Sequence, residues 1–452
     1  MCAPTIVAMN STCQNESNRA TQAKLQGPLT GLRVLEMGPL IAGPFVGKTL
    51  AEFGADVVKI EPPAREGRQG GDPLRMWRLL KDGTSVWWQV QSRNKRSIAV
   101  DLAMPEGQEV ARRLAAEVDV LVENFRPGVL EQWGLSPQLL LELNPGLVVL
   151  RVSGYGQTGP YSGRPGYGAI GEAMGGLRYL TGEPGRLPVR TGLSIGDTLA
   201  ALHGVIGVLI ALHHRNATRS PTKPRGSGQV IDVALYEAVF NVTESLLPEY
   251  SAFNVIREPA GSALPGIAPS NAYACKDGSV LIAGNGDGVF RRLMACIGRE
   301  DLRHDSALAT NEGRVAHVER LDQAIADWTR QRTVEDALNQ LDRNSVPAGR
   351  IYTIRDIVAD PQYAARDMLK TINLDDGHTL AVPGIVPKLS ATPGGIWRNA
   401  PRLGEHTAEV LRELGFSCEQ IESMRAKRVI ASLGDELQQS NSEDEETTNG
   451  RD

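Results

Sequence analysis

The segment RPGYGAIGEAMGG, at residues 164–176, consists mainly of small residues that run into a predicted helix, and Glu172 is its single acid. A second carboxylate, Asp197, follows the loop RTGLSIG at the start of another helix-like run. Carboxylates can act as nucleophiles or as general acids and bases, so these two are the first candidates for chemistry. Each also has a structural interpretation, because the helix dipole stabilises an acid at a helix start and Asp197 is placed to act as an N-cap.

Other motifs give weaker signals. The run GPFVGKT (43–49) resembles a phosphate-binding P-loop, but three residues instead of four separate its glycines. The turn GPLIAG is not the G-x-G-x-x-G pattern of a dinucleotide site. The seven histidines show no metal-binding spacing, and the five cysteines form no CxxC pair. We therefore expect no metal site, and we interpret the cysteines as reduced thiols of an intracellular protein.

Composition and net charge limit the kinds of partner that the protein is expected to bind. The chain has 452 residues, 41% of them hydrophobic and 22% charged, and a net charge of −5. This balance gives no electrostatic reason to expect nucleic acid or an anionic membrane as a partner. The apolar run LHGVIGVLIALHHR (202–215) is shorter than the roughly 20 residues that cross a bilayer, so it is predicted to be a buried helix and no membrane partner is expected.

The elements around the two carboxylates alternate between strands and helices. Apolar runs predict strands at 32–37, 56–62, 118–124 and 147–154. Helical patterns fill the intervals, including PEGQEVARRLAAE, which opens with a proline at its first turn. Repeated strand–helix–strand units of about 30 residues are typical of a parallel sheet with helices on both faces, so a doubly wound α/β fold is predicted.

A chain of this length is expected to form more than one domain. The first part of a large Rossmann-like domain is predicted at 27–225, a linker with a smaller α/β domain at 226–355, and a segment returning to the large domain at 356–430. Residues 1–26 are interpreted as a disordered leader, with a mitochondrial transit peptide as the alternative. The acidic, polar residues 431–452 are expected to be disordered. The predicted location is cytoplasmic, with mitochondria as the alternative.

Several blocks, in one order along residues 27–430, resemble the class III CoA-transferases of the formyl-CoA transferase and carnitine CoA-transferase type. They are GLRVLEMGPLIAGPFVGKTLAEFGADVVKIEPP, NKRSIAVDL, VDVLVENFRPGVLEQWGL, RVSGYGQTGPY, GQVIDVALYEA, VPAGRIYTIRDIVADPQ and LGEHTAEVL. The resemblance implies a homodimer of interlocked, ring-shaped subunits.

The same resemblance implies transfer of CoA from an acyl-CoA to a small carboxylic acid. An enzyme carboxylate attacks the thioester to form a mixed anhydride, CoA thiolate returns to give an enzyme thioester, and the incoming acid then takes the CoA. No permanently bound cofactor is expected, because the coenzyme A thioester is a substrate.

The resemblance also suggests where CoA binds. It places Lys95 and Arg96 near the CoA phosphates, although a solvated turn is the alternative for this NKRS segment. Further contacts are expected at strand ends, where open α/β sheets bind ligands. The predicted CoA-binding residues are Asn94, Lys95, Arg96, Asn124, Ser153, Gly154 and Tyr155. Asn124 has the alternative of being only a turn former.

The chain departs from the family pattern at the nucleophile. The family aspartate falls directly after the tyrosine or one place later, where this chain has Gly168 and Ala169. Glu172 lies one helical turn beyond the gap on the same face, so it is the first candidate for the acylated residue. Asp197 is the reserve. An acyl-CoA racemase of the same fold is a rival, but its His-Asp pair is replaced by Tyr167 and Gly168. A CoA-binding dimer without chemistry is the other rival.

Within the family, the run GYGAIGEAMGGLRYLTGEPGRLPVRTGLSIGD most resembles members that use succinyl-CoA and C4 or C5 dicarboxylates, such as itaconate, malate, citramalate or glutarate. A second substrate carboxylate requires a cationic partner, and Arg178 or Arg190 is the candidate, with surface exposure as the alternative for both.

Overall fold

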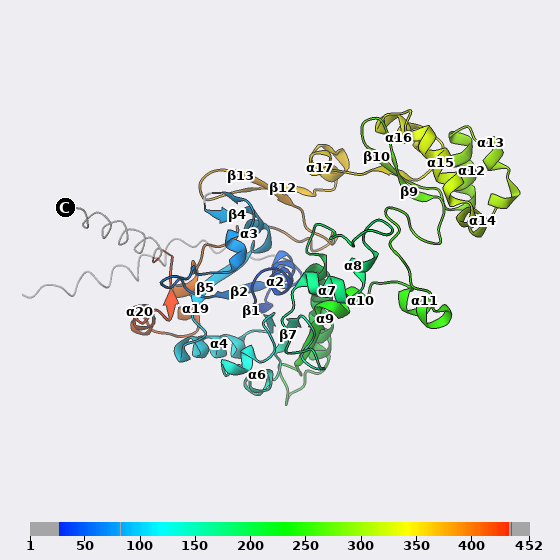
Figure 1. Ribbon diagram of the computed structural model, residues 1–452. Helices are drawn as coiled ribbons and strands as arrows, with labels where there is room; N and C mark the ends of the chain where they lie inside the picture. The colour runs from blue at the N-terminus through cyan, green and yellow to red at the C-terminus, as the bar shows by residue number, and fades with distance from the viewer. Residues whose placement is uncertain (1–26, 82, 434, 436–452) are drawn as a thin grey trace, which may run out of the picture. The chain divides into compact units, whose positions relative to one another are not determined.

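The computed structural model describes residues 27–81, 83–433 and 435. The predicted leader at 1–26 and most of the predicted acidic tail lie outside the described residues. The chain divides into two compact units, shown in Figure 1. The larger unit includes residues up to Gly175, Ser194–Val242 and the chain from Met368, and the smaller unit contains Gly176–Leu193 and Thr243–Asp367. The crossings at Val242 and Met368 lie later than the predicted boundaries at 225 and 355, and the segment 176–193 was not expected in the smaller unit.

The larger unit contains a seven-stranded sheet in the order β14-β5-β2-β1-β6-β7-β8. All neighbouring strands are parallel except β14, which pairs antiparallel with β5. The strands are β1 (Arg33–Glu36), β2 (Asp56–Glu61), β5 (Lys95–Val100), β6 (Val120–Glu123), β7 (Val148–Ser153), β8 (Gln229–Ala234) and β14 (Ile430–Ala431). The predicted doubly wound α/β fold is confirmed.

Helices cover both faces of this sheet (Figure 1). One face packs against α2 (Ala42–Glu52), α9 (Ile195–Ala217) and α10 (Leu235–Phe240). The other face packs against α4 (Pro105–Glu117), α6 (Pro137–Leu143), α19 (Thr407–Glu413) and α20 (Cys418–Ala426). The strands β6 and β7 are buried at every residue, which is why they appear in the sequence as continuous apolar runs without alternation.

Helix α9 differs from its prediction. It has 23 residues, and by length and composition alone it could cross a membrane. One face of α9, including Ala200, Gly204 and Val208, is buried in the core, as in a core helix of a globular protein. The opposite face is not buried, because Ile206 and Ile210 are 55% and 63% exposed. A long helix was expected over residues 196–215, and the structure confirms its length, but the prediction that it is buried holds for one face only.

The smaller unit has an antiparallel sheet in the order β11-β10-β9. Its strands are β9 (Ser270–Ala274), β10 (Ser279–Ala283) and β11 (Ala348–Arg350), and they pack with α12 (Asp287–Cys296), α15 (Val318–Thr329) and α16 (Val334–Arg343) around one apolar core. The smaller unit thus contains both strands and helices.

Candidate active site

The helices on the two sheet faces show where the direction of winding switches in the larger unit. Strand β1 lies between β2 and β6, and the helices that follow β1 and precede β6, α2 and α4, cover opposite faces. In open α/β sheets such a switch in winding leaves a crevice beyond the C-terminal ends of the strands. Asn124 directly follows β6, and Ser153 ends β7, so both lie at this edge as predicted.

Asn124 holds the turn that leads from β1 into α2. Its Nδ2 donates a hydrogen bond of 2.9 Å to the carbonyl of Pro39. A Cβ at Gly38 would lie 1.7 Å from Oδ1 of Asn124, so only glycine fits there. The structure thus gives Asn124 the turn-forming role, and its predicted contact with CoA stays a prediction.

The same turn carries backbone strain. Leu40 has a φ of 66°, a left-handed conformation that is rare for a residue other than glycine. Its N–H donates to both carboxylate oxygens of Asp72 at 3.0 Å, and Lys59 joins Asp72 to Glu36 through ion pairs of 3.0 Å each. The sequence analysis did not predict this buried network. The feature of the sequence that could have indicated it is a lysine and a glutamate inside otherwise apolar strands. Strained backbone held by its surroundings is typical of ligand sites.

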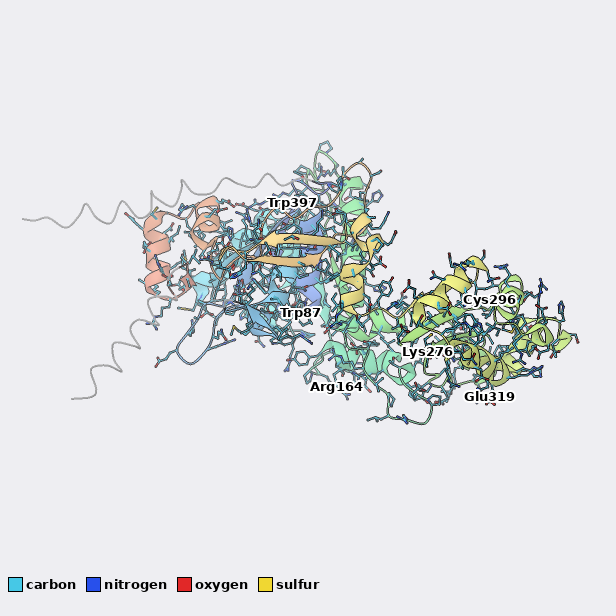
Figure 2. All side chains as sticks on the ribbon, turned by 90° about the horizontal axis from the view of Figure 1, so that it is seen from above. Trp87, Arg164, Lys276, Cys296, Glu319 and Trp397 are labelled. Atoms are coloured by element: carbon cyan, nitrogen blue, oxygen red, sulfur yellow. The ribbon has the colours of Figure 1, made fainter. Side chains whose placement is uncertain are left out.

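The residues Asn94, Lys95 and Arg96 lie elsewhere, at the N-terminal start of β5. Asn94 donates to the carbonyl of Gly395 at 2.8 Å and accepts from the N–H groups of Trp397 and Arg398. It therefore ties the returning chain to the edge of the sheet (Trp397 is labelled in Figure 2).

Both predicted phosphate ligands are engaged inside the fold. Lys95 is 0% exposed, and its Nζ lies 2.8 Å from Oε2 of Glu36. Burial lowers the pKa of Lys95 to about 8, although Glu36 opposes this effect. Arg96, 5% exposed, pairs with Asp56 at 2.6 Å and with two glutamates of α19. Neither cation lies in a solvated turn, and this geometry gives no support to their predicted binding of CoA phosphates.

The glycine-rich segment before α7 folds back on itself. Gly154 and Gly166 touch through their backbones, since a Cβ at Gly154 would lie 2.8 Å from Cα of Gly166. The ring of Tyr155 packs edge-on against Tyr161, with centroids 6.0 Å apart, and Arg164 lies over the Tyr161 ring (Arg164 is labelled in Figure 2). This fold brings the chain back from the end of β7, so that α7 (Gly168–Met174) begins beside the start of α9.

Asp197 and Gly168 meet where these helices begin. Gly168 is the first residue of α7, and Asp197 is the third residue of α9. A Cβ at Gly168 would lie 2.0 Å from Oδ2 and 2.6 Å from Cγ of Asp197. The N-cap of α9 is Ser194, so the interpretation of Asp197 as the N-cap is wrong. Its side chain lies instead against Gly168.

Glu172 lies one turn along α7, on the side that faces α9. It is 1% exposed, and its Oε1 accepts a hydrogen bond of 3.4 Å from the N–H of Gly196. Because Ser194 makes no side-chain capping bond, Glu172 supplies a partner for one of the open N–H groups at the start of α9. The predicted shared face of Gly168 and Glu172 is confirmed, since a Cβ at Gly196 would contact both residues.

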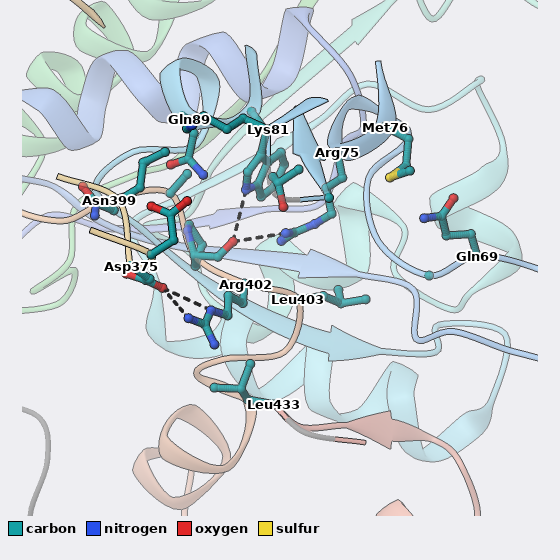
Figure 3. A pocket seen from close by; sticks show the side chains of 18 of the residues that line it. Gln69, Arg75, Met76, Lys81, Gln89, Asp375, Asn399, Arg402, Leu403 and Leu433 are labelled. Atoms are coloured by element: carbon teal, nitrogen blue, oxygen red, sulfur yellow. Dashed lines mark hydrogen bonds and ion pairs between the residues drawn. The ribbon is translucent and has the colours of Figure 1, made fainter. Parts of the chain in front are cut away.

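A cavity of about 660 Å³ lies in another part of the larger unit (Figure 3). It is lined by residues near α3 (Val86–Gln91) and by the returning C-terminal chain, among them Trp88, Arg75 and Arg402. Arg75 is paired with Glu61 at 2.7 Å, and Arg402 with Asp375 at 2.8 Å. These arginines are therefore already neutralised by acids.

Among the described residues, no group of three or more His, Cys, Asp or Glu side chains is arranged to hold a metal ion. Arg178 and Arg190, the predicted partners of a second substrate carboxylate, belong to the segment 176–193 of the smaller unit. Their role stays a prediction.

Comparison with known proteins identifies the family. The model of CoA-transferase family III matches residues 29–407. The chain is 46% identical to the succinyl-CoA–D-citramalate CoA-transferase of Chloroflexus aurantiacus, over 89% of this chain and 98% of that protein. It is 37% identical to the succinate–glutarate CoA-transferase of Agrobacterium fabrum, over 86% and 96%. A crystal structure of a CAIB/BAIF family protein from Brucella suis matches with a TM-score of 0.75 and 36% identity, covering 86% of this chain and 100% of that one. The chain therefore belongs to CoA-transferase family III, and it is a CoA-transferase enzyme.

Proposed function

We propose that this enzyme transfers CoA from succinyl-CoA to a C4 or C5 dicarboxylic acid. The observation that carries the proposal is the likeness, over nearly the full chain, to transferases whose names pair succinyl-CoA with citramalate and succinate with glutarate. Both of those acceptors are five-carbon dicarboxylates. The geometry adds a carboxylate pair, Glu172 and Asp197, at the start of α9.

A matrix of acyl-CoA donors and acids tests this function. Succinyl-CoA, acetyl-CoA and formyl-CoA are each combined with citramalate, malate, glutarate, itaconate, acetate and carnitine, and the CoA products are identified by mass. Succinyl-CoA with one or more of the dicarboxylates is expected to give the fastest exchange. Transfer restricted to the monocarboxylic acids would contradict the proposal.

The racemase alternative predicts a different observable. Racemisation next to a thioester needs a base on each face of the carbon. A racemase would exchange the hydrogen at that carbon with deuterated solvent in the absence of any acceptor acid, and a transferase of the proposed kind would not. Tyr167 caps α7 with its backbone and Gly168 has no side chain, so neither position supplies the expected His-Asp pair.

We also propose that the enzyme works as a homodimer. The exposed face of α9 supports it, because Leu202, Ile206, Leu209 and Ile210 are 44–63% exposed on a single helix. Contiguous apolar surface of this kind marks interaction sites in soluble proteins. Sedimentation over a wide dilution range is expected to show the dimer alone, and a folded monomer at nanomolar concentration would contradict the proposal. A cytoplasmic location, and the absence of nucleic-acid and membrane partners, stay predictions.

A further inference from the structure

We propose that Asp72 is a positioning residue for acyl-CoA. It holds Leu40 in a left-handed conformation, and it thereby fixes the turn 38–41, between β1 and α2, in the shape that receives the substrate. This inference deepens the proposed function and rests on it. Asp72 acts through the backbone of the turn, so the inference requires no contact between Asp72 and the substrate.

The turn 38–41 lies at the edge of the sheet where ligands are expected. It follows the C-terminal end of β1, and Asn124, which follows β6, binds it from the neighbouring strand. Open α/β sheets bind their ligands at this edge, where the direction of winding switches. Pro39 and Leu40 are partly exposed, whereas the residues on both sides of them are buried. The turn therefore presents its strained residue to whatever binds at the strand ends.

Side chains from other elements hold the backbone of this turn at each of its four residues. In the order of the residues that they hold, they are Lys59, Asn124, Asp72 and Gln91, at distances of 2.6–3.0 Å. A residue in a rarely populated backbone conformation persists only when its surroundings over-determine it, and such residues cluster at active sites and ligand clamps. Among these four side chains, Asp72 is the one that contacts the strained Leu40, with a φ of 66°.

Asp72 has little freedom to move away from Leu40. It is 3% exposed, and its carboxylate also accepts the N–H of Leu74 at 2.9 Å and pairs with Lys59 at 3.0 Å. Its own N–H donates to Oε2 of Glu61 at 2.8 Å. The two carboxylate oxygens that accept the N–H of Leu40 are therefore fixed by contacts on both the side chain and the backbone of Asp72.

The buried charges beside the turn are difficult to explain by stability alone. Lys59 and Glu36 are 1% and 0% exposed and lie 3.0 Å apart, and Lys59 also pairs with Asp72. Burial disfavours the charge on Lys59, but the neighbouring acids, Glu36 first, outweigh burial and raise the pKa of Lys59 above its usual value. Replacing buried ion pairs by apolar residues is often neutral or stabilising. We therefore attribute this network to the specification of one backbone conformation in the turn that it binds.

The strain at position 40 can be changed without altering the buried charges. Leu40→Gly removes the penalty on the left-handed conformation, whereas Leu40→Val increases it, because β-branched residues tolerate positive φ poorly. The full-length variants are titrated with CoA in a calorimeter. Leu40→Gly is expected to bind CoA within about threefold of the wild type, and Leu40→Val about tenfold more weakly. Wild-type affinity in the valine variant would show that binding does not need the left-handed turn, and it would overturn the inference.

Asp72→Asn tests the carboxylate directly. The amide keeps one acceptor oxygen but loses the second one and the ion pair with Lys59, so CoA should bind about tenfold or more weakly. The kcat/KM for succinyl-CoA should fall by the same factor. The KM for the acceptor acid should stay unchanged, because the acceptor lacks the CoA group that the turn is proposed to receive. A general loss of structure would affect both substrates.

The double variant Asp72→Asn/Leu40→Gly tests whether the two residues act together. Glycine adopts the left-handed conformation without help, so the double variant should recover most of the CoA affinity that Asp72→Asn loses. Strictly additive effects of the two changes would contradict the proposed coupling. If Asp72→Asn does not fold, the comparison of Leu40→Gly with Leu40→Val decides the question, because both keep the carboxylate.

Asp119 provides a matched control at the opposite end of β1. Its carboxylate accepts the N–H of Arg33 at 2.9 Å and pairs with Arg215 at 2.7 Å, so Asp119→Asn also weakens a backbone contact and an ion pair. It should lower the midpoint of urea denaturation and leave CoA affinity unchanged. An equal loss of affinity in both aspartate variants would indicate general destabilisation and overturn the inference. If the wild type neither binds CoA nor transfers it from any donor, the proposed function itself fails.

Discussion

Gly168→Ala is the most economical test of the crowding beside Asp197, because it adds one methyl group and no charge. The new Cβ would lie 2.0 Å from Oδ2 of Asp197, whereas ordinary contact begins near 3.4 Å. The carboxylate must therefore move by roughly 1 Å or more, and a misplacement of about 1 Å costs on the order of a hundredfold in rate. We expect kcat with succinyl-CoA to fall by about that factor.

Stability should respond in the opposite direction. Gly168 begins a helix with an ordinary φ, where alanine is favoured over glycine by roughly 0.5–1 kcal/mol. The atoms that clash belong to the end of a side chain, so the helix itself need not shift. Urea denaturation is expected to show a stability equal to or slightly above that of the wild type, which separates lost activity from lost folding.

Gly163→Ala is the matched control for this variant. Gly163 lies in the loop before α7, and a Cβ there would meet nothing within 4 Å. Its transfer rate should match the wild type. A Gly168→Ala enzyme as active as this control would show that Asp197 is not held against Gly168 during turnover, and it would refute the reasoning from shared volume.

Three further outcomes follow from the contacts described above. Lys95→Met leaves Glu36 with one cation fewer in a buried network, so urea denaturation should show a loss of about 3–5 kcal/mol, while the CoA affinity of the folded protein, measured by calorimetry, stays unchanged. Burial and nearby arginines lower the pKa of His406 to about 3. Between about pH 6.5 and 3, this histidine is therefore protonated in the unfolded chain but neutral in the native state. Its contribution to stability is complete above pH 6.5 and is lost on acidification by at most about 1.4 kcal/mol per pH unit, and His406→Asn should flatten that slope in denaturation curves. Ile210→Glu on the exposed face of α9 should produce monomer or aggregate in sedimentation, and an unchanged dimer would show that this face is not the interface.

Four strands of the large sheet, β1, β2, β6 and β7, were predictable because their apolar runs are nearly continuous, whereas β5, β8 and β14 were not predicted. The prediction at 147–154 corresponds to β7 at Val148–Ser153, and the prediction at 56–62 to β2 at Asp56–Glu61. Strands of a parallel sheet covered on both faces contain few polar residues, so their length and composition identify them without knowledge of their neighbours.

The charged residues at the start of β5 show why residue types alone did not predict that this segment is buried. NKRS looks like a solvated turn, because lysine and arginine are rarely buried without partners. The partners of these residues, Glu36 for Lys95 and Glu409 for Arg96, are distant in the sequence, and only the folded sheet brings them together. A pattern of residue types within one segment carries no information about such pairing.

The block LGEHTAEVL gives the same lesson from a family motif. Gly404 donates its N–H to Oγ of Ser97, and His406 both donates its N–H to the Ser97 carbonyl and accepts the Ser97 N–H through Nδ1. Thr407 accepts the N–H of Ala99 and donates to the carbonyl of Ala431. The block thus fastens the returning chain to β5. Its presence indicates the fold, and its residue types alone would not have separated this structural role from a catalytic one.

The two candidate carboxylates, Glu172 and Asp197, show both difficulties: residue type does not reveal a side chain's role, and spacing does not reveal its neighbours. Sequence spacing correctly placed Glu172 on the face of α7 that includes Gly168, yet burial and the hydrogen bond to Gly196 give that carboxylate a role in holding α9. Asp197 is further away in sequence than Glu172, and its carboxylate is nevertheless the one that fills the volume beside Gly168. Glycine at position 168 leaves room for this carboxylate, because a Cβ there would lie 2.0 Å from Oδ2 of Asp197.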